Sequence, residues 1–450
     1  MADFVPSEKI AAAVEKHRDM ILAAERYLWQ NPETGYKEYK ATAYLAERYR
    51  ALGYRLTMAE GITGFYTVID TGREGPEVLI LGELDAIICP VHKDADPVTG
   101  AVHSCGHNAQ SAALLGIAAA LSEPGMLDGL SGRIRLCAVP AEELLELEYR
   151  SGLCREGKIR YFGGKSEFLA RGYFDGVDLA FMVHTTWGDF SANAGSVGCI
   201  AKEITYHGRA AHAGGSPHLG INALYAATCG VNAVNAIRET FRESELIRVH
   251  PIITHGGDMV NAIPETVRME SYVRGSSFDA IVSANKKVNR ALTGAALSLG
   301  ANVEIIDIPG YAPLRNDPGM VQVAKDAFAL VCPGEQFYEV PRMGTGSTDM
   351  GDLSCIMPVV HPYAGGATGK SHGNDYQIAD AERACVTNAK WQLAMIRLLL
   401  SDGASRAKQI VADYKPLFDS KEAYLAYVDA LNAEGDRITY GEDGTASVKI

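Results

Sequence analysis

Four short segments carry the side chains that could do chemistry, and the densest is His103-Ser-Cys105-Gly-His107-Asn108-Ala-Gln110. Its Cys and second His stand two residues apart on a glycine-containing turn, just before an Ala/Leu-rich stretch. A thiolate at such a helix start is stabilised by the helix dipole and by a divalent metal. The alternative is a buried Cys beside a turn-capping His, because short Cys/His spacings also arise by chance.

The second segment is Pro140-Ala141-Glu142-Glu143, which directly follows an apolar run at residues 133–139. If that run is a strand, the two carboxylates lie at its carboxyl end, where open α/β sheets build their sites. Successive side chains there point in different directions, so one Glu can bind a metal while the other acts as a general base. The alternative is a solvated acidic helix start, which Glu146 and Glu148 favour.

The other two segments each contribute a histidine. His184 ends the apolar run 179–183, and His372 stands in Lys370-Ser371-His372-Gly373 after the glycines of residues 365–369. A phosphate-binding loop is excluded there, because the leading glycine of that pattern and its helix are missing. Together the four segments supply Cys, His, Glu, His and His with a spare Glu, which is the inventory of a two-metal hydrolase.

The elements that must position these side chains are strands alternating with helices. Helices are expected at 10–28, 41–52 and 110–121, and strands at 64–69, 77–81, 133–139 and 179–183. This alternation predicts an α/β domain with a central, mostly parallel sheet flanked by helices.

A different pattern interrupts this domain. Strands expected at 201–206, 250–254, 267–274 and 302–308, with helices at 222–239 and 278–299, follow the order βαββαβ of a two-layer α+β unit. The α/β pattern then returns, with a helix at 319–330, a strand at 358–363 and a helix at 380–400. We therefore expect a discontinuous larger domain, 1–198 and 312–450, around an inserted domain, 199–311. The C-terminal part of the larger domain is expected to form helices at 404–413 and 421–433, followed by a polar segment.

Composition narrows the class of protein. The 450 residues are 47% hydrophobic and 22% charged, with a net charge of −13 and no basic stripe, which argues against disorder and against nucleic-acid or anionic-membrane partners. No signal-peptide core and no run near the roughly 18 apolar residues of a membrane span is present. The nine cysteines lack a disulfide-framework spacing, so we expect a reducing compartment and a cytoplasmic protein.

The chain resembles the M20 metallopeptidases, specifically the amidohydrolase subfamily of aminoacylases, indole-acetyl-amino-acid hydrolases and aminobenzoyl-glutamate hydrolase subunits. The similarity runs from about Met20 to Leu400. The motifs that carry it are Trp29-Gln-Asn-Pro-Glu-Thr-Gly35, Cys105-Gly-His107, Ala141-Glu-Glu143, Gly208-Arg-Ala-Ala-His-Ala213, Asn261-Ala-Ile-Pro264 and Gly346-Ser-Thr-Asp349. The last motif, continued to Ser354, is closest to the B-type branch of the aminobenzoyl-glutamate hydrolases, as is Asn108, where many relatives carry Asp.

The resemblance implies a catalytic α/β domain interrupted by a lid that also dimerises. It implies two divalent metal ions per chain, Zn²⁺ or Mn²⁺, with Co²⁺ or Ni²⁺ also compatible with the donors. Cys105 would bridge the two ions, and the other ligands would be His107, Glu143, His184 and His372.

It also implies roles for other residues. Glu142 would be the general base, and Asp85 would orient a histidine ligand. His212 from the partner subunit's lid would stabilise the tetrahedral oxyanion, and Asn261 and Arg274 would hold the substrate's α-carboxylate. The alternative for Arg274 is a surface position on a strand.

The sequence departs from the family in three places. Leu144-Leu-Glu-Leu-Glu148 follows the Glu pair where relatives usually have glycines, and these leucines would narrow the pocket or reshape the loop. Residues 149–167 are longer than usual and carry Arg150, Arg155, Lys158, Arg160 and Lys165. This basic cluster would either meet an anionic substrate or be a solvated loop. Gln110 replaces a His that is not one of the five ligands.

The expected function is hydrolysis of the amide of an N-acyl or N-aroyl amino acid by a homodimer, with a second kind of subunit as a possible partner. The alternatives are a dipeptidase or carboxypeptidase with the same site, and a non-catalytic binding subunit. A redox role for Cys105 ranks last, because no Cys-x-x-Cys pair is present.

Overall fold

The central sheet of the molecule has six strands in the order β1-β2-β6-β3-β7-β17. These strands are β1 (Thr57–Met58), β2 (Phe65–Asp70), β6 (Arg133–Val139), β3 (Glu77–Glu83), β7 (Leu179–Phe181) and β17 (Val359–Val360). This computed structural model describes residues 7–450. Strand β2 pairs antiparallel with both β1 and β6, whereas β6, β3, β7 and β17 run parallel to one another. The predicted α/β class with a mostly parallel, mixed sheet is confirmed.

Helices cover both faces of this sheet, as the side chains of β3 show. Val78 and Ile80 belong to one core cluster, and Leu79 and Leu81 to another on the opposite face. A strand that is buried on both faces has an unbroken run of apolar residues in its sequence. The first face is covered by α1 (Ser7–Glu15), α2 (Arg18–Gln30), α3 (Tyr39–Ala51), α4 (His107–Leu121), α9 (Pro318–Val331) and α11 (Asn388–Leu400), and the second by α6 (Gly164–Ala170), α10 (Met350–Leu353) and α13 (Lys421–Asp429).

Two helix predictions need correction. The helix expected at 10–28 is two helices, α1 and α2, separated at residues 16–17. The helix expected at 110–121 begins three residues earlier, at His107. His107 therefore lies in the first turn of α4, next to the loop that carries Cys105.

A second sheet beside the central one was not foreseen. It joins β15 (Leu314–Arg315), β9 (Ser191–Ser196), β18 (Tyr363–Ala364) and β8 (His184–Thr185), with β16 (Tyr338–Gly344) also paired to β9. The strand expected at 358–363 is split: β17 stays in the central sheet, while β18 pairs with β8. This split brings His184 close to the segment around His361.

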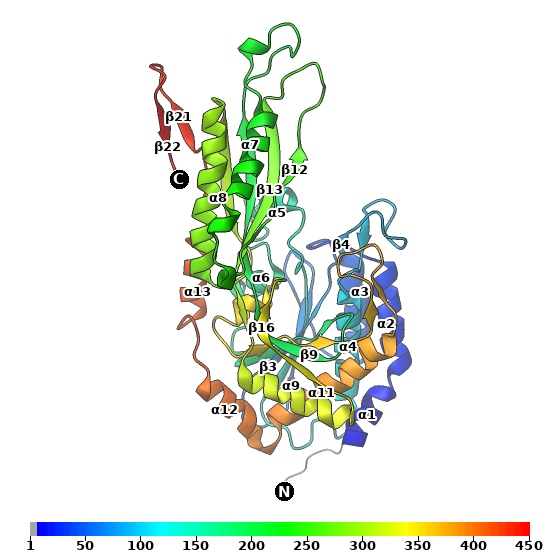
Figure 1. Cartoon of the computed structure of the whole chain (residues 1–450). Helices are drawn as coiled ribbons and strands as arrows, with labels where there is room; N and C mark the ends of the chain where they lie inside the picture. Colours follow the sequence, from blue (N-terminus) through cyan, green and yellow to red (C-terminus); the bar gives the residue numbers. More distant parts are fainter. Residues whose placement is uncertain (1–6) are drawn as a thin grey trace.

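The inserted domain has the predicted βαββαβ order, with one extra short strand. Its elements are β10 (Gly198–His207), α7 (Ala223–Ala236), β11 (Arg248–Val249), β12 (Ile252–His255), β13 (Thr266–Gly275), α8 (Phe278–Ser298) and β14 (Asn302–Pro309). The antiparallel sheet is ordered β11-β13-β10-β14, and β12 also pairs with β13. Helices α7 and α8 pack on it through residues such as Tyr206, Val234 and Met269, and the domain projects from the large one (Figure 1).

The C-terminal segment crosses from the large domain to the inserted domain. After α12 (Ser405–Asp413) and α13, a hairpin of β21 (Ile438–Tyr440) and β22 (Ala446–Val448) lies beside α8 (Figure 1, red). The expected division places residues 433–438 with the larger domain, yet they hydrogen-bond to β14: Asp307 N–H donates to the Ala433 carbonyl (2.7 Å) and Arg437 N–H to the Val303 carbonyl (3.0 Å). Ile438 is buried in the inserted domain's core.

Between residues 7 and 450, none of the helices combines the length and the apolar character needed to cross a bilayer. All nine cysteines are free thiols.

Ile438→Ala should lower the free energy of unfolding by about 2–5 kcal/mol, because it removes buried methyl groups from a packed core. Denaturant unfolding followed by circular dichroism measures this loss. The matched control is Val448→Ala, since Val448 is the exposed register partner of Ile438 in the same hairpin and should change stability by less than about 0.5 kcal/mol. Equal losses in both variants would mean that the hairpin does not hold the domain through Ile438.

Candidate metal centre and its pocket

The loop before α4 sets a thiol and an imidazole side by side. Cys105 lies between β5 (Ala101–Val102) and α4, and Gly106 follows it with φ +86°. A Cβ on Gly106 would lie 2.4 Å from the Tyr376 hydroxyl. Only glycine combines this left-handed backbone with so close a neighbour. The chain can therefore pass from Cys105 straight into α4, with His107 as its first residue.

Hydrogen bonds at Nδ1 orient two of the histidines. Nδ1 of His107 lies 2.9 Å from the Asp85 carbonyl oxygen and 3.2 Å from Asp85 Oδ1, and Nδ1 of His184 lies 2.7 Å from the Thr185 carbonyl oxygen. When Nδ1–H donates to these oxygens, each Nε2 keeps a lone pair. Nε2 of His184 is 3.4 Å from Cys105 Sγ. Cys105, His107 and His184 thus form one group of donors within 4.8 Å of one another.

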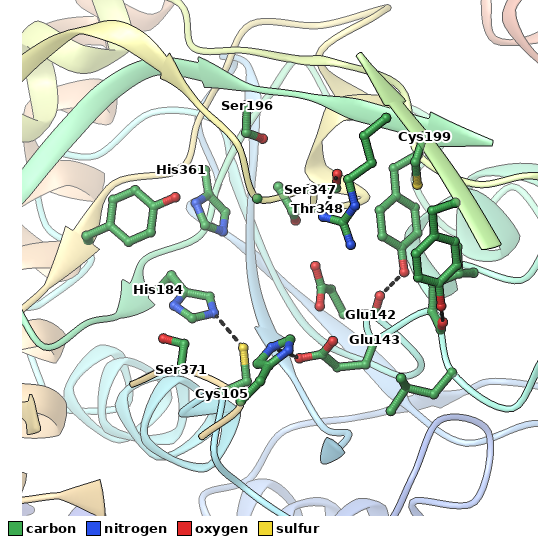
Figure 2. A pocket seen from close by; sticks show the side chains of 18 residues that line it. Cys105, Glu142, Glu143, His184, Ser196, Cys199, Ser347, Thr348, His361 and Ser371 are labelled. Atoms are coloured by element: carbon green, nitrogen blue, oxygen red, sulfur yellow. Dashed lines mark hydrogen bonds and ion pairs between the residues drawn. The ribbon is translucent and has the colours of Figure 1, made fainter. Parts of the chain in front are cut away.

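A second group shares the same thiol. Cys105, Glu143 and His372 also offer donor atoms within 4.8 Å of one another, and His372 Nε2 is 2.9 Å from Glu143 Oε1. His372 has φ +62°, and its N–H donates to the Ser104 carbonyl (2.9 Å), which ties its loop to the Cys105 loop. The structure therefore brings all five expected ligands together around Cys105. Figure 2 shows Cys105 and His184 facing each other beside Glu142 and Glu143.

The chemistry of this donor set fits two divalent ions. Sulfur, imidazole nitrogen and carboxylate oxygen suit borderline metals. Within residues 7–450, His107 Nε2 is buried without a hydrogen-bond partner. Burial and Glu143 raise the pKa of the Cys105 thiol, but His107 and His184 outweigh them and lower it to about 6. A thiolate ready to bind metal follows.

The Glu pair is presented by a strained turn. Ala141 has φ +56°, a conformation that is costly for alanine and typical of functional sites, and its N–H donates to Glu38 Oε1 (2.8 Å). Asp85 Oδ2 accepts from Glu143 N–H (2.7 Å). Glu142 is left to face the cavity. Its pKa lies well above the usual range, because burial and then the charges of Glu83 and Glu143 disfavour its ionised form.

The Trp29–Gly35 motif with the neighbouring Lys37, and the leucines after the Glu pair, support this turn. Thr34 Oγ1 donates to Glu146 (2.6 Å), and Lys37 forms an ion pair with the same carboxylate (2.6 Å). Leu144 and Leu145 line the cavity, and Leu144 packs in a core cluster with Tyr311. The side chains that replace the family's glycines thus form part of the cavity wall.

The cavity has a volume of about 320 Å³, which is in the range of small-molecule sites. Arg274, at the end of β13, lines it together with Ser347 and Thr348. Nη1 of Arg274 donates to Ser347 Oγ at 3.3 Å, while its Nε is buried without a partner in the described chain. Arg274 is therefore a cavity residue and not a surface position on a strand.

Two expected residues do not reach the cavity of their own chain. His212 and Asn261 are exposed in loops of the inserted domain, where His212 forms a backbone bridge with Ala262. Nδ1 of His212 accepts from the N–H groups of Gly214 (3.1 Å) and Gly215 (3.0 Å). Neither residue lines the cavity.

Sequence reasoning missed four buried residues at this site: Glu83, Lys165, Asp349 and His361. Lys165 and Arg150 were expected in a basic cluster that meets an anionic substrate or forms a solvated loop, but both side chains are buried. Their partners are internal: Lys165 contacts Glu83 and Asp349, and Arg150 donates to the Phe162 carbonyl (2.8 Å). The sequence did contain one indication for Glu83: it lies two residues before the candidate Asp85, and residues two apart on a strand share a face.

Comparison with known proteins identifies the family of this chain. The family described as "Peptidase family M20/M25/M40" matches residues 79–397. The mouse (Mus musculus) Xaa-Arg dipeptidase is 27% identical over 383 residues, which are 79% of this chain and 78% of the mouse protein. The B subunit of the p-aminobenzoyl-glutamate hydrolase of Escherichia coli (strain K12) is 27% identical over 300 residues, 65% of this chain and 58% of that protein.

Among solved structures, a dinuclear metal binding peptidase of the M20 family from Bacillus subtilis superimposes with a TM-score of 0.61 at 20% identity, over 86% of this chain and 99% of that one. The chain belongs to the M20/M25/M40 peptidase family, as its motifs predicted. It is a metal-dependent hydrolase that acts on amide bonds.

Cys105→Ser should remove most of the bound metal, because both donor groups share this sulfur and a serine hydroxyl stays protonated near neutral pH. Elemental mass spectrometry on protein purified without chelator should find close to two ions per chain in the wild type and far less in the variant. Cys229→Ser is the matched control, since Cys229 is exposed on α7. Unchanged metal in Cys105→Ser would remove the thiol from the centre.

Proposed function

We propose that the chain hydrolyses the amide bond of an N-acyl or N-aroyl amino acid, with two divalent ions held by Cys105, His107, Glu143, His184 and His372. The observation that carries this proposal is the pair of donor groups sharing one thiol, next to the cavity-lining Glu142, which belongs to neither of these two groups. When bound, the ions would polarise the amide carbonyl and make an attacking water more acidic. Zn²⁺ or Mn²⁺ fits the donors, and Co²⁺ or Ni²⁺ is also compatible.

Glu142 is the general base in this proposal. It takes a proton from the attacking water and later delivers that proton to the leaving amine. Its raised pKa suits this shuttle, because a carboxylate with a raised pKa is a stronger base toward the attacking water and holds the proton until the amine leaves. The main-chain carbonyl of Glu142 accepts a hydrogen bond from the Tyr311 hydroxyl, which keeps the carboxyl group in place.

Arg274 is proposed to bind the α-carboxylate of the amino acid product half. It is the one Lys or Arg side chain among the residues that line the cavity, and its planar fork suits a carboxylate. Ser347, which accepts from Arg274, and its neighbour Thr348 provide hydroxyl groups at the same end. The acyl group would then lie toward Leu144 and Leu145.

His212 and Asn261 act, in this proposal, across a homodimer. They are exposed on the inserted domain and away from their own cavity, so a second copy of the chain would have to present them. His212 would then donate to the oxyanion of the tetrahedral intermediate, and Asn261 would contact the substrate. The relative in Escherichia coli is named as a subunit, which makes a different partner chain the second arrangement to test.

A dipeptidase activity is the second candidate, favoured by the similarity to the Xaa-Arg dipeptidases. The same donors and the same base would serve, and only the group bound on the acyl side differs. A substrate panel separates the two activities: acetyl, benzoyl and aminobenzoyl amino acids on one side, and dipeptides with a free amino terminus on the other. Higher kcat/KM on the acylated series supports the proposal, and higher kcat/KM on dipeptides overturns it.

Glu142→Gln should lower kcat by about 10²–10⁴-fold while the metal content stays at the wild-type level, because only the proton-carrying group is lost. Steady-state kinetics and elemental analysis of the same sample provide both numbers. Glu148→Gln is the control, since Glu148 is exposed and pairs with Arg268 at the surface. A loss of less than about tenfold would mean that Glu142 is not the base.

Arg274→Ala should weaken substrates with a free α-carboxylate more than their carboxamide analogues, because only the former lose a charged partner. Comparing kcat/KM for the two series in wild type and variant isolates that contribution. Arg268→Ala serves as the control, because Arg268 lies on the same strand but is exposed. Equal losses on both series would place the carboxylate elsewhere.

A further inference from the structure

Beneath the five expected ligands lies a buried chain of three charged side chains. Glu83 is the last residue of β3, and its Oε1 accepts from Lys165 Nζ at 2.5 Å. Lys165 also contacts the carboxylate of Asp349, whose other oxygen accepts from the Lys165 N–H at 2.8 Å. All three side chains are fully buried. Two carboxylates share one ammonium, so the trio carries a net charge of −1.

The other oxygen of Glu83 has no such partner. Oε2 forms no hydrogen bond to any residue from 7 to 450, and it lies 3.2 Å from His107 Nε2, which is equally unpartnered. His107 uses Nδ1–H toward Asp85, so in the neutral ring Nε2 offers a lone pair. These two buried atoms lie close enough to bind one cation placed between them. Such a cation would satisfy both atoms.

Lys165 keeps Glu83 available for this task. Its ammonium group binds Oε1 at 2.5 Å, which leaves Oε2 on the side of His107, 3.2 Å from Nε2. Glu83, His107 and Glu142 offer donor atoms within 4.8 Å of one another, and His107 is the donor that this group shares with Cys105 and His184.

The position of Glu83 relative to the cavity indicates which ion it serves. Cys105 and His184 line the cavity, whereas His107 and Glu83 do not. An ion held by Cys105, His107 and His184 would thus have the cavity on the side of Cys105 and His184, and the buried Glu83 on the side of His107. The second group, Cys105, Glu143 and His372, is formed entirely by cavity-lining residues.

We propose that Glu83 is a fourth protein ligand of the ion held by Cys105, His107 and His184, fixed in place by Lys165 and Asp349. This inference rests on the proposed two-metal function. It makes the coordination of the two ions different. The ion held by Cys105, His107 and His184 would have only protein ligands, and the ion beside Glu143 and His372 would keep an open coordination position. Closed sites are structural and open sites are catalytic, so substrate would meet the second ion.

The test is a Co²⁺ titration of metal-free protein, with a chelator as competitor and the visible spectrum recorded at each step. Wild type should bind two ions, the first more tightly. Glu83→Gln keeps the shape of the side chain but removes the charge, and it should weaken the tighter ion by at least about tenfold and change the spectrum of the first equivalent bound. The competition constants and spectra do not depend on turnover.

The matched control is Glu77→Gln. Glu77 begins the same strand, is equally buried and pairs with Arg135 at 2.5 Å. Glu77→Gln therefore removes a buried charge, as Glu83→Gln does, but changes no group at the proposed metal site. Glu77→Gln should bind both ions like wild type. Equal weakening in both Gln variants would show a general loss of stability and overturn the proposal.

Glu83→Asp provides a second route if Glu83→Gln does not fold, because it keeps the charge and only withdraws the oxygens by one methylene. It too should weaken the tighter ion while circular dichroism remains native. Wild-type affinities and spectra in either folded Glu83 variant overturn the inference and leave the two-metal function intact. Absence of metal binding in wild type, by contrast, overturns the proposed function itself.

Discussion

Buried negative charge is the constraint on which the rest of this structure depends. The carboxylates of Glu83, Glu142 and Glu143 and the thiol of Cys105 share a region from which the fold excludes most water. Like charges in such a region repel strongly, and the raised pKa of Glu142 shows that effect. Lys165 is the one buried ammonium that the described chain places against these groups. Bound divalent ions would supply the remaining positive charge, so metal binding and the stability of this region are expected to be linked.

The fold meets this constraint by gathering strand ends and strained turns at one place. Glu83 is the last residue of β3, the Glu pair follows the neighbouring parallel strand β6, and His184 begins β8 just after β7. Two residues with left-handed backbone, Ala141 just before the Glu pair and His372 itself, then turn the chain at this place. Such conformations persist only where the surroundings hold them. Here the hydrogen bonds of Ala141 to Glu38 and of His372 to Ser104 provide that hold.

Much of this could be predicted because it depends on local patterns. The rule that sites form at the carboxyl ends of parallel strands placed Glu142, Glu143 and His184 together, and the hydrophobic period revealed the inserted βαββαβ unit. What was missed depends on distant partners. Strands of two residues such as β8 and β18 have no period to detect, and Lys165 looked solvated because Glu83 and Asp349 lie far away in the sequence. The C-terminal hairpin was read as a polar end, because Ile438 alone marks its buried side.

The inserted domain is more than a cover, because two of its contacts reach the turn that carries the proposed base. The Tyr272 hydroxyl, from β13, donates to the Leu144 carbonyl, and the Tyr311 hydroxyl, where the chain returns to the large domain, donates to the Glu142 carbonyl. Arg274 lies two residues beyond Tyr272 on the same strand. A rotation of the inserted domain would therefore displace the proposed carboxylate-binding Arg274 and the main chain of the Glu pair together. The position of the proposed base and the proposed contact with the substrate would thus change together, and residues 433–437, which connect α13 to β14, would restrain that change.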